Sequence, residues 1–180
     1  MKSMTFAEQL EICPRTIETL LSQKKTEMFP IQSACFAPLY AGSDVMARDL
    51  TGSGKTLAFA LPLLERFRSE KTVGNGKLKV VCLTPTRELA LQITQVFESL
   101  RNFEDEFAVV SIYGGVSYEP QLRVLEKGAD FVIGTTGRIK DYVVKNQINF
   151  QNLECMILDE ADRMMQMNFL DDIQEIFQTV

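Results

Sequence analysis

At residues 50–56 the chain reads Leu50-Thr51-Gly52-Ser53-Gly54-Lys55-Thr56, and an apolar helical pattern follows from residue 55 toward residue 67. The glycines let backbone N–H groups turn inward around phosphate oxygens, and the positive end of the following helix favours anions. Lys55 can meet the outer phosphates of a nucleotide, and the Thr56 hydroxyl can bind Mg²⁺. The segment therefore predicts a phosphate-binding loop whose nucleotide contacts are Thr51, Gly52, Ser53, Gly54, Lys55 and Thr56.

A second segment, Leu158-Asp159-Glu160-Ala161-Asp162, ends an apolar run that predicts a strand. We expect Asp159 to hold Mg²⁺ directly or through water, and Glu160 to position the attacking water. Taken alone, Glu160 has the alternative of a solvated acid at a strand end. A phosphate loop followed by such carboxylates is the layout of a P-loop NTPase, so the expected catalytic residues are Lys55, Asp159 and Glu160.

Between these segments, short apolar or β-branched runs alternate with helical patterns. Strands are predicted at residues 44–48, 79–83, 108–113, 131–134 and 155–158. Helices are predicted at residues 55–67, 88–100, 120–127 and 138–145, with another after residue 169. This alternation predicts an α/β fold with a mostly parallel sheet and helices on both faces. In such sheets, ligands bind outside the carboxyl ends of the strands, where both segments are expected to lie.

The composition limits the classes of protein that fit this chain. Its 180 residues with 46% hydrophobic content can bury the core of one domain. The formal net charge of −5 argues against a polybasic protein that holds nucleic acid by bulk electrostatics, so any such contact must be local. The four cysteines form no C-x-x-C pair and histidine is absent, which argues against a zinc site or a disulfide framework.

The hydropathy pattern bears on the compartment. The longest apolar run, residues 57–64, is too short to span a bilayer, and the N-terminus has no signal-type apolar core. We expect a soluble, intracellular protein without membrane contacts, whose cysteines are core thiols. Nucleus, nucleolus and cytoplasm stay open, and so does the oligomeric state.

Three more segments follow predicted strands: Pro85-Thr86-Arg87-Glu88-Leu89-Ala90, Gly114-Gly115 and Thr135-Thr136-Gly137-Arg138. With Asp159-Glu160-Ala161-Asp162, their order and spacing match one family. Over essentially all of residues 1–180, the chain resembles the first RecA-like domain of DEAD-box ATP-dependent RNA helicases. Residues 29–32 and 137–141 are similar to the nucleolar RNA helicase II branch. The resemblance implies RNA-stimulated ATP hydrolysis coupled to local unwinding of RNA duplexes, with ATP or ADP and Mg²⁺ as cofactors.

The same resemblance assigns residues 6–32 to adenine recognition. Pro30-Ile31-Gln32 looks like the end of the family's adenine-reading motif, and Phe6 stands 26 residues before Gln32, where the family has an aromatic that stacks on adenine. A glutamine amide offers both an acceptor and donors, so it can read the matching edge of adenine. Alone, Phe6 has the alternative of a helix anchor, and Gln32 that of a polar residue at a helix start.

For nucleic acid, the resemblance implies a track that binds the RNA backbone away from the ATP. Its residues are Pro85, Thr86, Arg87, Gly114, Gly115, Thr135, Gly137 and Arg138. Arginine forks and exposed backbone N–H groups suit phosphate oxygens but carry no sequence information, so little sequence preference is expected. On composition alone, Arg87 has the alternative of pairing with a neighbouring acid.

Three of the departures from the family pattern bear on activity. Phe29 replaces the usual threonine or serine, which removes a hydroxyl that commonly ties the adenine motif to the phosphate loop. Asp49 brings a carboxylate near the phosphates, with the alternative that it caps the loop. Thr136 replaces the proline of the family's T-P-G-R and frees φ there. Whether these changes impair activity stays open.

The chain stops at Val180, before the Ser-Ala-Thr segment that follows the carboxylates in this family. The resemblance therefore implies a truncated first domain, with the second RecA-like domain as its missing partner. Because that domain supplies arginines to the γ-phosphate, we expect the isolated chain to hydrolyse ATP weakly or not at all. Two alternatives stay open: a DNA translocase or transport ATPase, and a nucleotide-dependent RNA or protein clamp with little or no catalysis.

Overall fold

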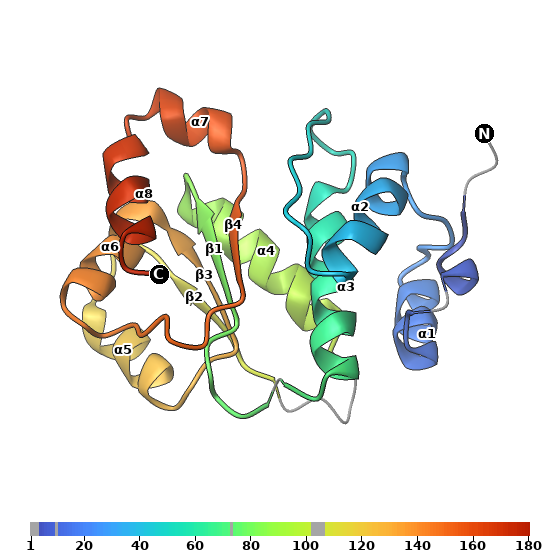
Figure 1. Cartoon of the computed structure of the whole chain (residues 1–180), viewed down its shortest axis with the longest axis horizontal. Coiled ribbons are helices and arrows are strands. Elements are labelled where there is room, and N and C mark those ends of the chain that lie inside the picture. The colour runs from blue at the N-terminus through green and yellow to red at the C-terminus, as the bar shows by residue number, and fades with distance from the viewer. Residues whose placement is uncertain (1–3, 10, 73, 102–106) are drawn as a thin grey trace. The chain divides into compact units, whose positions relative to one another are not determined.

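The computed structural model describes residues 4–9, 11–72, 74–101 and 107–180. Its contacts divide the chain into two compact units (Figure 1). The first unit comprises Met1–Thr72 and Val96–Asp105, and the second comprises Val73–Gln95 and Glu106–Val180. The single domain expected from the sequence stays a prediction.

The second unit contains a parallel sheet. Its strands are β1 (Val80–Thr84), β2 (Val109–Ile112), β3 (Phe131–Thr135) and β4 (Cys155–Leu158). They lie in the order β2-β3-β1-β4, and every neighbouring pair is parallel. The predicted α/β class with a parallel sheet is thus confirmed, and four of the predicted strands agree with the structure to within two residues at each end.

Helices cover both faces of this sheet, because successive side chains of a strand point to opposite sides. Val81 and Leu83 belong to a core that includes Ile139 of α6 (Thr136–Val144) and Ile176 of α8 (Leu170–Phe177). That core also contacts α5 (Tyr118–Glu126) and α7 (Ala161–Gln166). Figure 1 shows α4 (Arg87–Ser99) on the other side of the strands, where it presents the fully buried Ala90 and Ile93.

One buried carboxylate fastens the amino-terminal end of the sheet. Asp130 is 1% exposed and directly precedes β3. One of its carboxylate oxygens accepts a hydrogen bond from Gly74 N at 2.9 Å, and the other accepts one from Ala108 N at 2.8 Å. The carboxylate is therefore satisfied by backbone donors, as a buried charge requires.

The first unit is helical in the described residues. It contains η1 (Phe6–Glu8), α1 (Pro14–Ser22), α2 (Pro30–Tyr40) and α3 (Lys55–Ser69), joined by the end of α4. Its polar centre is Glu65 of α3, 2% exposed, which accepts hydrogen bonds from Cys13 N at 2.9 Å and Thr16 Oγ1 at 2.6 Å. Arg68 lies 2.6 Å from the same carboxylate. Glu65 thereby caps the N-terminus of α1, where no side chain of α1 itself does so.

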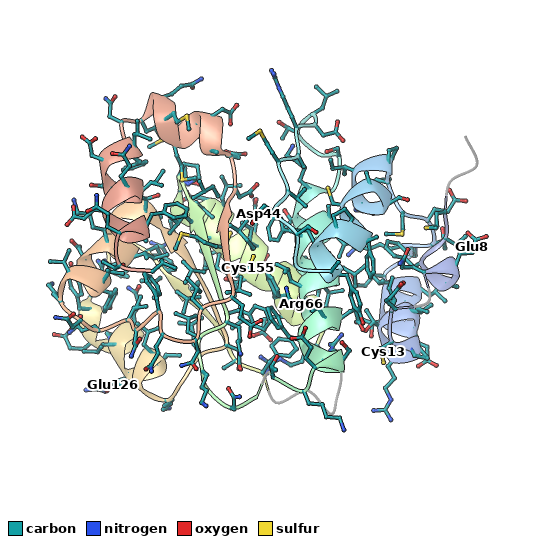
Figure 2. All side chains as sticks on the ribbon, in the orientation of Figure 1. Glu8, Cys13, Asp44, Arg66, Glu126 and Cys155 are labelled. Carbon is teal, nitrogen blue, oxygen red and sulfur yellow. The ribbon has the colours of Figure 1, made fainter. Side chains whose placement is uncertain are left out.

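The strand predicted at residues 44–48 is wrong. Residues 43–50 lie in neither a helix nor a strand and are exposed along their whole length, with Met46 at 100% and Asp44 labelled in Figure 2. The segment has only two adjacent strand-forming apolar residues, Val45 and Met46. So short a run does not specify a pairing register, and no alternation holds one side against a core. The short helix α7 was not predicted.

No helix within the described parts of the chain combines the length and the apolar character that a membrane span requires.

Candidate functional site

The phosphate loop lies in the first unit, directly before α3. Gly52 and Gly54 both have φ of +83°, in the left-handed region that glycine adopts without strain. Ala58 N donates to Gly54 O at 3.1 Å, which begins the helical ladder. The N–H groups of residues 55–57 precede that ladder, so they are the donors that a helix N-terminus offers to an anion.

Lys55 is held against the loop it follows. Its Nζ donates to Asp49 O at 2.9 Å and to Leu50 O at 2.8 Å. The Asp49 carboxylate accepts a hydrogen bond from Leu50 N at 2.8 Å, so it caps the loop, as the alternative for this residue expected. An incoming phosphate must compete with two carbonyl oxygens for the lysine, which keeps one further N–H free to donate.

These residues fit a nucleotide phosphate. Ser53 Oγ is buried and has no hydrogen-bond partner among the described residues, which leaves a polar atom that a phosphate oxygen would satisfy. The Thr56 side chain is half-buried at the first turn of α3, where a hydroxyl ligand of Mg²⁺ is expected.

The adenine-motif glutamine is tied to the phosphate loop. Gln32 is 4% exposed; its Oε1 accepts from Phe29 N at 2.9 Å and its Nε2 donates to Gly54 O at 3.2 Å. The glutamine amide thus joins the start of α2 to the phosphate loop. One N–H and one lone pair of that amide stay available to a base, so adenine contact by Gln32 stays a prediction.

The flanking aromatics differ in exposure. Phe29 is 52% exposed, and its ring lies close enough to Gly54 that a Cβ built there would be 2.8 Å from Phe29 Cδ2. Phe6 is only 2% exposed, within the core of the first unit. Stacking of Phe6 on adenine, which stays a prediction, requires one ring face to be uncovered.

The carboxylate pair lies in the second unit, at the carboxyl end of β4. Asp159 N donates to Leu83 O at 3.1 Å, which continues the β1–β4 ladder past the strand. Glu160 has φ of +53° and caps α7, and its carboxylate pairs with Arg163 at 3.2 Å. A left-handed glutamate is uncommon, and such strain gathers at functional sites.

A metal would not be held here by protein ligands alone. In the described ranges, no three histidine, cysteine, aspartate or glutamate side chains come together in a way that could bind a metal ion. Mg²⁺ commonly takes one or two carboxylates and completes its shell with phosphate oxygens and water. Binding of Mg²⁺ by Thr56 and by Asp159, each considered in its own unit, stays a prediction.

The expected RNA residues all belong to the second unit, and most follow the carboxyl ends of β1, β2 and β3. After β1, Pro85 is buried, and Thr86 Oγ1 accepts from Leu89 N at 3.3 Å and caps α4. Arg87 is exposed, with its guanidinium 4.5 Å from the centre of the Tyr113 ring. Arg87 thus contacts a tyrosine ring here, which differs from the alternative of an ion pair with a neighbouring acid.

The glycines of the track are open to solvent contact. A Cβ built on Gly114, Gly115 or Gly137 would meet nothing within 4 Å, so the backbone there is accessible to a ligand. Thr135 is the N-cap residue of α6, without a capping hydrogen bond from its side chain, and Thr136 is the first residue of the helix. The buried Thr136 hydroxyl donates to Met164 Sδ at 3.3 Å. Arg138, by contrast, is only 7% exposed.

Tyr113, Tyr118 and Gln121 also belong to this region and were missed in the sequence. Gln121 is buried and hydrogen-bonds to Tyr113 and Ser117, and Tyr118 lies under Arg138. Tyr113, directly before the glycine pair, was the only sequence signal, and it reveals neither its own contact with Arg87 nor that of Tyr118 with Arg138.

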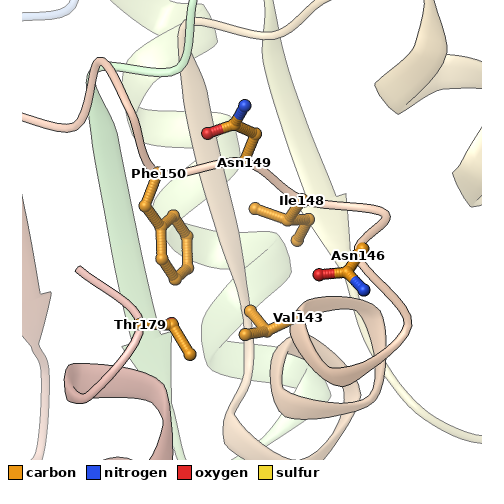
Figure 3. A pocket seen from close by; sticks show the side chains of 6 residues that line it. All are labelled: Val143, Asn146, Ile148, Asn149, Phe150 and Thr179. Atoms are coloured by element: carbon orange, nitrogen blue, oxygen red, sulfur yellow. The ribbon is translucent and has the colours of Figure 1, made fainter.

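A cavity of about 340 Å³ lies elsewhere in the second unit. Figure 3 shows its lining side chains, which come from α6, the segment before β4 and the end of the chain: Val143, Asn146, Ile148, Asn149, Phe150 and Thr179. None of the expected site residues lines it.

Comparisons with known proteins agree with these motifs. The family model described as DEAD/DEAH box helicase matches residues 29–180. Nucleolar RNA helicase 2-B of Xenopus laevis is 39% identical over 163 residues, which are 89% of this chain and 20% of that protein. ATP-dependent RNA helicase DeaD of Haemophilus influenzae is 42% identical over 148 residues, which are 82% of this chain and 23% of that protein.

The solved structure of Mss116p bound to ssRNA and AMP-PNP matches with a TM-score of 0.89 and 29% identity, over 97% of this chain and 36% of that one. The chain thus spans about a fifth to a quarter of the curated relatives it matches. Identity to the bacterial protein (42%) is no lower than that to the nucleolar one (39%), so the similarity to the nucleolar branch is shared and not exclusive. The matched residues, the fold and the motif order together show that the chain belongs to the DEAD/DEAH box helicase family.

Proposed function

We propose that this chain is the ATP-binding, first RecA-like domain of an ATP-dependent RNA helicase. The observation that carries the proposal is the phosphate loop. It has two left-handed glycines, a buried Ser53 hydroxyl that finds no hydrogen-bond partner in the described parts of the chain, and Lys55 at the start of a 15-residue helix. The printed names of the relatives, and the ssRNA and AMP-PNP in the Mss116p structure, support ATP and RNA as the ligands.

In this proposal, Lys55 leaves its two carbonyl partners to bind the outer phosphates, and the N–H groups at the start of α3 bind the phosphate oxygens. Mg²⁺, when bound, neutralises charge on the phosphates, and Thr56 and Asp159 would hold it. Glu160 orients the attacking water and accepts its proton. Gln32 and Phe6 recognise the adenine. Motif order and family membership support this grouping of residues from the two units.

RNA is proposed to bind along the exposed ends of the second unit. Arg87 and the N–H groups of Gly114, Gly115 and Gly137 would contact phosphates and sugars, and Pro85, Thr86, Thr135 and Arg138 complete the track. Such contacts favour nucleic acid without strong sequence preference. Coupling of ATP turnover to unwinding would require the second RecA-like domain of the family, so we expect the 180-residue chain alone to turn over ATP weakly.

The test is ATP turnover by the longest available form of the protein, with single-stranded RNA, with DNA and with neither. RNA-specific stimulation is expected, and Lys55→Ala and Glu160→Gln should each abolish it, because removal of a phosphate ligand or of the water-positioning group typically costs orders of magnitude in rate. Persistent turnover in both variants would refute the site. Equal stimulation by DNA would indicate a translocase, and ADP binding without turnover would indicate a clamp.

A further inference from the structure

The glycine loop, residues 113–117, is fastened by two buried side chains from the helices around it. Gln121 of α5 accepts from Tyr113 N at 2.9 Å and donates to Tyr113 O at 3.2 Å and Ser117 O at 3.3 Å. Arg138 of α6 donates from Nη2 to Val116 O at 2.8 Å. The backbone is thus fixed on both sides of Gly114 and Gly115, which are the exposed apex of the loop.

Arg138 is poorly placed to touch a ligand itself. The residue is only 7% exposed, and its Nη2 already donates to the loop carbonyl Val116 O. A phosphate at the protein surface cannot reach a buried nitrogen unless the surrounding side chains move. Arg87, on the same track, is exposed.

Tyr118 explains how the Arg138 guanidinium is held. Its ring centre lies 3.9 Å from Arg138 Cζ and 4.1 Å from Lys145 Nζ, and cations at such distances are attracted to the face of a tyrosine ring. The Tyr118 hydroxyl donates to Asp141 Oδ2 at 2.6 Å, and its carbonyl accepts from Tyr142 Oη at 3.0 Å. The ring therefore has a fixed position against α6.

We infer that Tyr118 and Arg138 are positioning residues that hold the glycine loop, so that Arg138 acts on RNA through the backbone N–H groups of Gly114 and Gly115 and not by touching a phosphate. This inference rests on the proposed RNA binding of that loop. A loop held in advance loses less conformational freedom when a ligand binds, so releasing it weakens binding even though no ligand contact is removed.

The salt dependence of RNA binding distinguishes an arginine that contacts a phosphate from one that only holds the loop. Each phosphate contact with a single strand adds about 0.7 to the slope of log affinity against log salt concentration. For Arg138→Gln in the longest available protein, we expect about tenfold weaker binding of a fluorescent single-stranded RNA and an unchanged slope. The exposed Arg87→Gln is the matched control and should lower the slope by about 0.7. A slope that falls equally in Arg138→Gln would overturn the inference.

Tyr118 supplies a second pair of variants. Tyr118→Phe keeps the ring under Arg138 and should bind RNA within about twofold of wild type, whereas Tyr118→Leu removes the ring and should weaken binding about tenfold. Tyr40→Leu, in α2 of the first unit, is the control for loss of a tyrosine. Wild-type affinity in Tyr118→Leu would refute the role of the ring.

Hydrogen exchange provides a readout that needs no RNA. Peptides covering residues 113–117 should exchange faster in Tyr118→Leu and Arg138→Gln and at the wild-type rate in Tyr40→Leu, because only the first two release the loop. Unchanged exchange in both positioning variants would overturn the inference. Absence of RNA binding by the wild-type protein would refute the proposed function instead. The exchange rates would then still show whether Tyr118 and Arg138 hold the glycine loop.

Discussion

Replacing Gly54 by alanine puts a methyl group into the contact between the phosphate loop and the adenine-motif glutamine. A Cβ at this position would lie 2.3 Å from Gln32 Nε2 and 2.8 Å from Phe29 Cδ2. The Gln32 amide is the end of a flexible side chain and can move. Its movement gives up the bond to Gly54 O, which joins α2 to the loop, and the bond from Phe29 N, which caps the start of α2.

The expected loss of stability has two parts. Alanine at φ of +83° costs about 1 kcal/mol after the gain from a less flexible unfolded chain is taken into account. The two displaced hydrogen bonds cost about 1 kcal/mol each. Gly54→Ala should therefore lower the free energy of unfolding by about 3 kcal/mol, and it should weaken ADP binding because the loop and its glutamine no longer keep their positions.

Gly52→Ala is a matched control, because Gly52 has the same φ of +83° but nothing within 4 Å of its Cβ. Urea unfolding monitored by circular dichroism should show that Gly52→Ala lowers the free energy of unfolding by about 1 kcal/mol. In a Gln32→Ala background, the excess cost of Gly54→Ala over Gly52→Ala should largely disappear. The reasoning is refuted if the two glycine variants differ by less than about 0.5 kcal/mol, or if the excess survives without Gln32.

Three further changes test other parts of the structure. Glu65→Ala removes the carboxylate that pairs with the largely buried Arg68 and uncaps α1, so urea unfolding should show a loss of about 3 kcal/mol in the free energy of unfolding; Arg101→Ala, at an exposed pair, should cost less than about 1 kcal/mol. Burial, with the Asp159 carboxylate and Cys155 adding to it, raises the pKa of the Cys82 thiol well above its ordinary 9.0. The folded state thus favours the neutral thiol, so the free energy of unfolding should fall as the pH rises above 9.0, where the thiol ionises in the unfolded chain. Cys82→Val should remove this fall. Parallel plots of the free energy of unfolding against pH for wild type and Cys82→Val would contradict the prediction. Thr136→Pro should leave ADP and RNA binding unweakened, because Thr135 already has the extended φ of −73° and ψ of 139° that precedes a proline and residue 136 is the first of α6; a fall in RNA affinity would reject this.

The sheet could be predicted from the sequence because its strands are short apolar runs; residues 80–83 are continuously apolar and buried along their length, which is typical of a parallel strand covered on both faces. The phosphate loop was predictable for a local reason, since glycines, lysine and helix start are adjacent in the chain. The strand predicted at residues 44–48 was wrong because a strand must pair with another strand, and the sequence of these five residues specifies no such pairing.

The parts of the site that depend on packing could not be predicted. The bond from Gln32 to Gly54 joins residues 22 positions apart, and the contact of Tyr118 with Arg138 joins residues of two different helices. The burial of Arg138 also had no signal in its neighbours, because charged residues are exposed unless a partner holds them. Such contacts follow from the tertiary structure and not from local pattern.

Asp130 has a consequence for the order in which the chain can be completed during synthesis. Its carboxylate accepts hydrogen bonds from Gly74 N and Ala108 N. These residues lie 56 and 22 positions earlier, near the two points where the chain enters the second unit. A ribosome adding roughly 5–20 residues per second makes Gly74 about 3–11 seconds before the acid that will accept its N–H. Until then, the chain lacks both this anchor and β3, with which β1 pairs. The parallel sheet therefore cannot begin to form when β1 is made, but only after β3, the third strand in the chain, has been synthesised.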